Sequence, residues 1–328
     1  MTSLLKVGIA GTGSYAPARV MTNNDFKEIE TSDAWIRERT GIRERRIAEP
    51  GEATSHIAAN ACRKALEAAN VAAEDIDLIV TGTITPDNVF PSTSCHLQHQ
   101  LGCVHAGGLD VSAACSGFIY SLSTGWAYVR AGLARNVLCV GAEKLSSITD
   151  FKDRTSCILF GDGAGAVVLR PSETPSEILF SSLHALGGHD AVMSVPGGGS
   201  RMPASHETID SRLHFMRLKG REVFKFAVTK MVEQVELCAS KCGVPVSKIA
   251  MVVPHQVNLR ILEYAAEKLA IPLDRMAINI DRYGNTSSAS VPIALDEAVR
   301  AGRIKRGDLV VMVAFGAGLT WGSVAVRY

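Results

Sequence analysis

Val111-Ser112-Ala113-Ala114-Cys115-Ser116-Gly117-Phe118 is the stretch from which the fold can be worked out. An apolar run over 109–111 enters it, and helix-like sequence continues to about residue 132. This order places Cys115 on a tight strand-to-helix turn, with its sulfur at the N-terminal end of the helix. Because free N–H groups and the dipole favour an anion there, the turn predicts a lowered thiol pKa and a nucleophilic thiolate. The small residues on both sides of Cys115 leave room for a substrate. The alternative interpretation is that Cys115 is an inert buried thiol.

The composition is that of a large globular protein. The chain has 328 residues, of which 47% are apolar, enough for two domains or one large double domain. The 34 Lys and Arg nearly balance the 33 Asp and Glu, which argues against a general nucleic-acid-binding protein. Neither a signal peptide nor an uncharged apolar run of about 18 residues is evident, so we expect a cytosolic protein. Most of the eight cysteines lie in apolar patterns, which disfavours a disulfide framework.

Two early motifs resemble nucleotide-binding elements. Residues 11–17 contain a Gly-x-Gly pattern, but Pro17 blocks the helix that a dinucleotide loop requires, so we predict a plain turn. Residues 31–43 predict a short helix, capped by Ser32 or Asp33, that carries Trp35 and Arg39 on one face. Such a pair can stack an adenine and hold a phosphate, or it can belong to an ordinary amphipathic surface helix.

The remaining elements follow from periodicity and turn residues. The cysteines and histidines between 95 and 105 lack the spacing of a zinc site, so we predict a packed helix there and no metal. Residues 161–170 read as a glycine-rich corner between strands, and 171–211 as a boundary and a loop lining a substrate entrance. Helices are predicted over 53–69, 92–102, 220–242, from 260 to 269 and 291–300, and strands over 6–10, 77–83, 136–140, 156–160, 249–253, 276–280, 309–313 and 323–327.

The two halves of the chain repeat one pattern. Residues 71–80 and residues 244–253 share one predicted order, a short link followed by a buried strand. Residues 160–170 and residues 315–327 share another, a strand, a glycine-rich corner and a second strand. Strands this apolar are covered on both faces. We therefore predict an α/β fold with α/β/α/β/α layers and two mixed sheets, divided into 1–171, which carries the cysteine, and 172–328. A cleft between the halves is the expected place for a site.

Three polar groups lie at predicted strand ends: Cys115, His255 and Asn285. His255 follows Pro254 where an apolar strand ends, although a lone histidine is usually structural. Asn285 lies in a Gly-Asn-Thr-Ser turn, which is also good turn chemistry.

Together these motifs resemble the thiolase-fold condensing enzymes, and most closely the β-ketoacyl-acyl-carrier-protein synthase III family. The resemblance covers almost the whole chain. The matching segments are 31–43, 114–118, 159–165, 253–260, 283–292 and 316–322.

The resemblance implies an initiating condensation of fatty-acid synthesis. Cys115 would take an acyl group from acyl-CoA, and malonyl-acyl-carrier-protein would then lose carbon dioxide. His255 and Asn285 would donate hydrogen bonds to the enolate oxygen, and the N–H groups of Cys115 and Ala317 would form the oxyanion hole. CoA is a substrate here, and no cofactor is implied.

Other roles are implied position by position. CoA would be held by Thr31, Trp35, Arg39 and Arg154. The acidic carrier protein would dock on Gln256, Val257, Asn258, Leu259 and Arg260. Phe90 would reach the acyl pocket of a partner subunit, which implies a homodimer.

Some alternatives stay open at this point. A polyketide- or quinolone-type synthase shares the Cys-His-Asn set, and an inert CoA- or acyl-binding module is a further possibility. Ala317 and Leu319 replace residues of a turn that is often Gly-Gly-Gly-Phe in the family. The length and branching of the acyl primer are undetermined, with Thr85, Phe90, Cys157 and the loop 184–214 expected to shape the pocket.

Overall fold

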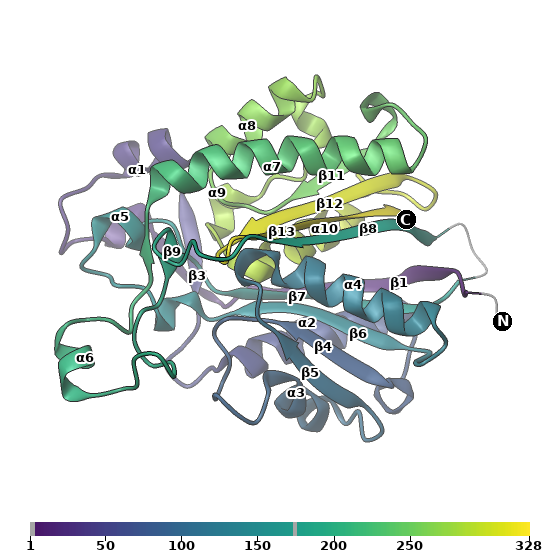
Figure 1. Ribbon diagram of the computed structural model, residues 1–328, viewed down its shortest axis with the longest axis horizontal. Helices are drawn as coiled ribbons and strands as arrows, with labels where there is room; N and C mark the ends of the chain where they lie inside the picture. The colour runs from purple at the N-terminus through teal and green to yellow at the C-terminus, as the bar shows by residue number, and fades with distance from the viewer. Residues whose placement is uncertain (1–3, 173–175) are drawn as a thin grey trace.

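The computed structural model describes residues 4–172 and 176–328 as two central sheets between layers of helices (Figure 1). The first sheet has the strand order β1-β7-β6-β4-β5 and the second β11-β12-β13-β8. The first sheet comprises β1 (Val7–Tyr15), β4 (Leu78–Gly82), β5 (Gly107–Val111), β6 (Val137–Glu143) and β7 (Gly163–Pro171). The second comprises β8 (Glu177–Ala185), β11 (Met251–Pro254), β12 (Leu309–Gly316) and β13 (Thr320–Arg327).

Helices form the other three layers, as predicted. α2 (Thr54–Ala69) and α3 (Thr93–Leu101) cover the outer face of the first sheet, and α7 (Gly220–Lys241) and α8 (Leu259–Lys268) cover the second. α4 (Gly117–Arg130) and α10 (Ser290–Arg300) lie between the sheets and contact both. The α/β/α/β/α architecture with two mixed sheets is therefore confirmed. All strands of the first sheet end at or before residue 171, and all strands of the second sheet follow it. The division of the chain into two domains at this residue stays a prediction.

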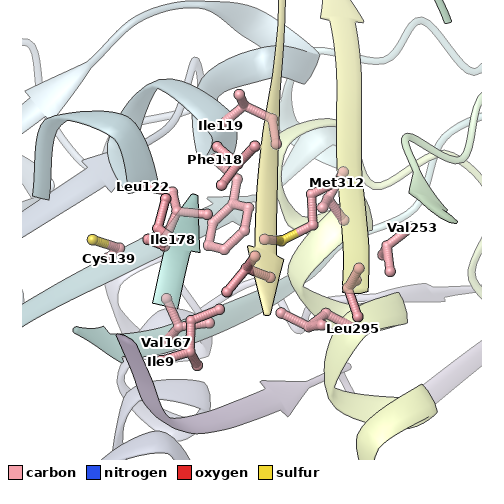
Figure 2. Packing of buried hydrophobic residues seen from close by; sticks show 14 of the residues in the cluster. Ile9, Phe118, Ile119, Leu122, Cys139, Val167, Ile178, Val253, Leu295 and Met312 are labelled. Carbon is pink, nitrogen blue, oxygen red and sulfur yellow. The ribbon is translucent and has the colours of Figure 1, made fainter. Parts of the chain in front are cut away.

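The central helices join both sheets in one hydrophobic core (Figure 2). Phe118 and Leu122 of α4 pack with Val167 of the first sheet, and Leu295 of α10 packs with Met312 of the second. All five side chains are buried, and each contributes about 1.5–3 kcal/mol relative to an exposed position. The core thereby fixes α4, whose first turn follows Cys115, relative to the second sheet.

Strand direction brings the polar strand ends together. β4 runs parallel to both β5 and β6, so Val111 and Glu143 end at the same edge of the first sheet. β11 runs parallel to β12 and ends at Pro254, directly before His255. Ligand sites of α/β sheets lie at such carboxyl edges.

The predicted turn at 11–17 is wrong, because β1 continues to Tyr15. A Cβ on Gly11 would lie 2.6 Å from the carbonyl oxygen of Ala65, and one on Gly13 would lie 2.3 Å from that of Ala61. The glycines therefore allow α2 to lie directly against the strand. Their function is close packing, and a phosphate-binding loop is absent from this segment.

Three further predictions were wrong. Residues 156–160 form no strand, since α5 (Arg154–Cys157) occupies this segment, and Phe160 makes a single bridge to Asn285. Residues 276–280 contain one bridge residue, Met276, and the start of α9 (Ile280–Tyr283). The predicted loop over 171–211 contains β8, whose polar residues suit an edge strand.

The smaller elements surround the two sheets. The predicted helix near Trp35 is α1 (Asp33–Thr40), with Ser32 as its N-cap. No helix within the described ranges is long and apolar enough to cross a membrane. The small elements are α1 (Asp33–Thr40), α6 (His206–Asp210), β2 (Arg19–Thr22), β3 (Glu44–Ile47), β9 (Met193–Ser194) and β10 (Arg217–Leu218).

Candidate active site

Cys115 lies on the strand-to-helix turn that the sequence predicted. β5 ends at Val111, a single 3-10 turn spans Ala114–Ser116, and α4 begins at Gly117. Ala114 has the left-handed φ of +45°, a conformation that a non-glycine residue holds only under surrounding constraint. The hydroxyl of Ser116 donates to the carbonyl of Ala113 at 2.7 Å and helps to hold the turn.

The loop between β12 and β13 packs directly against this turn. A Cβ on Gly316 would lie 2.6 Å from the backbone nitrogen of Cys115, so only glycine fits. Thr320 Oγ1 donates to the carbonyl of Ala113 at 2.9 Å and contacts Ser116 Oγ at 2.7 Å. The chain segment entering Ala317 is therefore held beside the backbone of Cys115.

The predicted lowering of the Cys115 pKa is wrong. Burial raises the pKa of the thiol to about 12, the charge of Glu143 raises it further, and a hydrogen bond from Ser287 lowers it only in part. Desolvation is the largest cause of this shift, because burial disfavours the charged thiolate. At neutral pH Cys115 is a thiol, so its activation needs a proton acceptor.

His255 lies immediately after β11 and is 1% exposed. Its backbone N–H donates to the carbonyl of Val313 at 2.8 Å, and the ring of Phe315 packs edge-on at 5.4 Å. Nδ1 lies 2.7 Å from the hydroxyl oxygen of Ser290. Burial lowers the pKa of His255 to about 3, so its imidazole is neutral at physiological pH.

Asn285 is fixed on both sides by backbone hydrogen bonds. Its N–H donates to the carbonyl of Leu159 at 2.8 Å, and its carbonyl accepts from Gly161 at 3.1 Å. The side-chain Oδ1 accepts from the N–H of Ser287 at 2.8 Å. Because Oδ1 is engaged in the turn, Nδ2 is the hydrogen-bond donor that Asn285 can present to a substrate.

The side chains of Cys115, His255 and Asn285 line one cavity. Cys115 comes from the first half, and His255 and Asn285 come from the second. The cavity encloses about 720 Å³ of space, with its open mouth included. The rest of its lining is mainly apolar, and includes Leu159, Phe160, Met193, Leu218, Val223, Phe224, Phe226, Val257, Ile261, Phe315 and Leu319.

Cys115 also lines a second, smaller cavity. It is lined by Cys115, Ser194, Ser287 and Ala317 together with apolar side chains. These apolar side chains are Ile84, Ala114, Leu145, Phe160, Met193, Val195 and Met216. A mainly apolar pocket that a thiol helps to line suits a hydrocarbon chain attached to the sulfur.

The residues of this pocket differ from those expected. Met193, Ser194 and Val195 of the expected loop 184–214 line this pocket, but Cys157 packs with Phe26 and Ile36 in a separate cluster. Thr85 is buried and hydrogen-bonds Glu143. Neither residue lines the pocket because both side chains are committed to neighbouring contacts.

Sequence reasoning missed Glu143, the last residue of β6. Its carboxylate is fully buried and accepts hydrogen bonds from Thr85 Oγ1 at 2.6 Å, Ser288 Oγ at 3.0 Å and Ser287 Oγ at 3.2 Å. It therefore ties the end of β6 to the turn that carries Asn285. The signal was present in the sequence, since an acidic residue ends an otherwise apolar run.

Glu143 makes stability depend on pH. Burial raises its pKa from the usual 4.5 to about 7. The carboxyl therefore contributes stability that is fully present below pH 4.5 and is lost as the pH rises through 7. We expect the unfolding free energy of the wild type to fall relative to that of Glu143→Gln, by about 1.4 kcal/mol per pH unit over this window. Urea unfolding of both proteins at several pH values measures this, and a constant difference would contradict it.

The residues expected to hold CoA surround the ring of Trp35. The guanidinium carbons of Arg39 and Arg154 lie 4.3 Å and 5.0 Å from its centroid. Thr31 Oγ1 is buried nearby and has no hydrogen-bond partner within the described part of the chain. Asn258, which lines the large cavity, donates to the carbonyl of Arg39 at 2.9 Å and so connects α1 with the cavity.

The expected docking residues divide into two groups. The predicted docking role of Gln256 is wrong, because this residue is 1% exposed and out of reach of a macromolecule. Its side-chain amide donates to the carbonyls of Pro254 and Ala277. Val257 and Asn258 line the cavity, and Leu259 packs against Gly41 of the α1 end. Arg260 is exposed, and its guanidinium lies 3.8 Å from the carboxylate of Glu38.

Phe90 lies apart from the three central residues. Its side chain is 84% exposed, and it lines neither cavity at Cys115.

Among the described residues there is no cluster of three or more His, Cys, Asp or Glu side chains that could bind a metal.

Two family models match this chain. The model 3-Oxoacyl-[acyl-carrier-protein (ACP)] synthase III matches residues 109–187, and its C-terminal counterpart matches residues 239–328. A Beta-ketoacyl-[acyl-carrier-protein] synthase III of Caldanaerobacter subterraneus is 50% identical over 329 residues, covering 100% of this chain and 99% of the relative.

Solved structures show the same similarity. The 3-oxoacyl-[acyl-carrier-protein] synthase III of Aquifex aeolicus VF5 is 46% identical with a TM-score of 0.91, covering 98% of this chain and 100% of that one. A priming β-ketosynthase from the R1128 polyketide biosynthetic pathway is 35% identical with a TM-score of 0.93, covering 99% and 97%. Both similarities extend over the full two-sheet fold.

Proposed function

This chain belongs to the 3-oxoacyl-[acyl-carrier-protein] synthase III family, and from that premise we propose the reaction that its site performs. It is a condensing enzyme of the acyltransferase type. The proposed reaction joins an acyl group from acyl-CoA to malonyl-acyl-carrier-protein, with loss of carbon dioxide, and starts fatty-acid synthesis. The observation that carries the proposal is the single cavity lined by Cys115, His255 and Asn285.

The first half-reaction acylates Cys115. Its sulfur attacks the thioester carbonyl of acyl-CoA, the bond to the CoA sulfur breaks, and the acyl group stays on the enzyme as a new thioester. The backbone N–H groups of Cys115 and Ala317 stabilise the oxyanion formed on the way. The hydrocarbon chain occupies the small, mainly apolar pocket that Cys115 helps to line.

The second half-reaction forms the carbon–carbon bond. The malonyl group enters through the large cavity and loses carbon dioxide, which places negative charge on the enolate oxygen. His255 and the Nδ2 amide of Asn285 stabilise this charge by hydrogen bonds, as expected from their position beside Cys115. The enolate carbon then attacks the acyl-Cys carbonyl and releases the sulfur.

The test supplies acyl-CoA with either malonyl-acyl-carrier-protein or malonyl-CoA and identifies the products by mass spectrometry. A 3-oxoacyl product on the carrier protein supports the proposal. A polyketide-type synthase is the second candidate, favoured by the similarity to the R1128 priming ketosynthase. Product formed only from malonyl-CoA would support a synthase of that kind, and no product with either donor would support the inert binding module.

CoA and the carrier protein are proposed to reach the same cavity from its mouth. Trp35, flanked by Arg39 and Arg154, suits an adenine and its phosphates. The exposed Arg260, adjacent to cavity residues Val257 and Asn258, suits an acidic carrier protein.

Charge reversal at Arg260 tests the docking proposal. We expect Arg260→Glu to raise the KM for malonyl-acyl-carrier-protein about tenfold, because a repulsive charge replaces an attractive one, and to leave the KM for acyl-CoA unchanged. Steady-state kinetics with each substrate varied in turn measures the effect. Arg135→Glu, which reverses a charge near the opposite end of β6 from the site, is the matched control. An increase confined to the KM for acyl-CoA would contradict docking at Arg260.

We also propose a homodimer. Val89 and Phe90 are 94% and 84% exposed on one loop, which is unusual for large apolar side chains. β5, the strand that leads to Cys115, is an edge of the first sheet, and Gly107 and Gly108 on it are exposed. A second copy would cover both features, with Phe90 reaching the partner's acyl pocket. The predicted cytosolic location stays a prediction.

A further inference from the structure

Ser290 lies between the imidazole of His255 and the turn that carries Asn285. It is the first residue of α10 and is 1% exposed. Its hydroxyl oxygen lies 2.7 Å from Nδ1 of His255 and 2.8 Å from the carbonyl oxygen of Ser287. Both distances are those of hydrogen bonds, although the hydroxyl has only one hydrogen to donate.

The chemistry of the two neighbours decides where that hydrogen lies. The carbonyl of Ser287 can only accept, so the Ser290 hydroxyl donates to it. The hydroxyl oxygen must then accept from His255, which requires a hydrogen on Nδ1. The opposite arrangement, with the hydroxyl donating to Nδ1, would leave two acceptor oxygens facing each other at 2.8 Å. A neutral imidazole has one N–H, so Nε2 carries a lone pair.

We propose that Ser290 is a positioning residue that fixes the hydrogen of His255 on Nδ1, and thereby makes Nε2 the acceptor of the Cys115 thiol proton. The inference rests on the proposed function, because an acceptor is needed only if the thiol is acylated. His255 and Cys115 line the same cavity. Both are uncharged at rest, since burial raises the pKa of the thiol to about 12 and lowers that of the imidazole to about 3.

Each proton of the reaction can be followed. As the sulfur of Cys115 bonds to the acyl carbon, its proton moves to Nε2 of His255 and then to the departing sulfur of CoA, which leaves as a thiol. The imidazole is then neutral again, with its hydrogen on Nδ1. When the malonyl group loses carbon dioxide, the negative charge of the enolate favours protonation of the adjacent imidazole, so Nε2 takes up a proton from solvent and donates it as a hydrogen bond to the enolate oxygen. When the carbon–carbon bond forms and the sulfur of Cys115 is released, the sulfur recovers a proton from Nε2.

The hydrogen of His255 can be located by nuclear magnetic resonance of the full-length enzyme labelled with ¹⁵N-histidine. Protonated and bare ring nitrogens of a neutral imidazole give separate signals, and a His255→Asn sample identifies those of His255. At neutral pH without substrate, we expect a hydrogen on Nδ1 and a bare Nε2. A hydrogen on Nε2 with a bare Nδ1 would overturn the proposal.

Two substitutions test the consequence for the first half-reaction. Ser290→Ala removes the acceptor for Nδ1–H, so we expect mixed protonation of the two nitrogens and slower acylation of Cys115. The expected loss is about 10- to 100-fold, part of the 10²–10⁴ that a general base contributes. Ser290→Thr retains the hydroxyl and should retain the wild-type signals and most of the rate. Wild-type acylation rates in a folded Ser290→Ala protein would overturn the proposal.

The readouts separate this inference from the function on which it rests. The position of the hydrogen on His255 is measured without substrate, and therefore independently of any reaction. If the wild type shows a bare Nε2 but no acylation of Cys115, the proposed function fails while the assignment of the hydrogen stands. If Cys115 is acylated but Nε2 carries the hydrogen, the function stands and the role of Ser290 is refuted.

Discussion

Cys115→Ala is expected to abolish acyl transfer, with a loss of at least about 10⁴-fold in the rate of product formation. The reason is chemical, because the sulfur of Cys115 forms the bond to the acyl group and alanine offers no nucleophile. The measurement is the mass of the intact protein after incubation with a mixture of acyl-CoAs. The wild type should gain the mass of one acyl group, and its size reports the preferred primer. Peptide mapping should place that group on Cys115.

The matched control is Cys95→Ala, which removes an exposed cysteine outside both cavities. It should acquire the same acyl group at the wild-type rate. Circular dichroism should confirm that Cys115→Ala is folded, since alanine is smaller than cysteine and fits the same turn. An acyl adduct on folded Cys115→Ala, with unchanged product formation, would remove Cys115 from the mechanism.

The layered fold could be predicted because its signals are local. Apolar strands such as β6 and β12, each followed by a glycine-rich or polar turn, are recognisable without any tertiary contact. Because this pattern is repeated in the second half of the chain, the second sheet could also be predicted. β1 was underestimated because Gly11 and Gly13 are typical of turns, and only their contact with α2 explains them.

The chemistry of the site could be predicted only in part. The motifs identified Cys115, His255 and Asn285, which line one cavity. Cys115 and His255 follow strands β5 and β11, whereas Asn285 is held there by its bridge to Phe160. The pKa of Cys115 depends on how completely the folded chain excludes water, a quantity that a local motif does not contain. For the same reason Gln256, a polar residue in a polar stretch, was assigned to the surface although the protein buries it.

The proposed catalytic role of Asn285 can be separated from its structural role in the turn by a substitution that keeps the turn contact and removes the Nδ2 donor. Asn285→Asp keeps an oxygen at Oδ1 to accept from the N–H of Ser287 and replaces the Nδ2 donor by a second oxygen. We expect condensation to fall by about 10²–10³-fold or more, because one donor to the enolate oxygen is lost. Acylation of Cys115 should persist, since that step uses the backbone N–H groups of the oxyanion hole.

Rapid quenching followed by mass spectrometry measures the two steps separately, as acyl-enzyme formed from acyl-CoA and as its decay on adding malonyl-acyl-carrier-protein. The accumulation of acylated Asn285→Asp is the expected result. Asn136→Asp is the control, because Asn136 is also buried and uses its Nδ2 to donate to a carbonyl, that of Asp75, far along β6 from the site. That variant should lower stability without changing the ratio of the two rates. Loss of acylation in Asn285→Asp, with condensation of preformed acyl-enzyme intact, would instead place Asn285 in the first half-reaction.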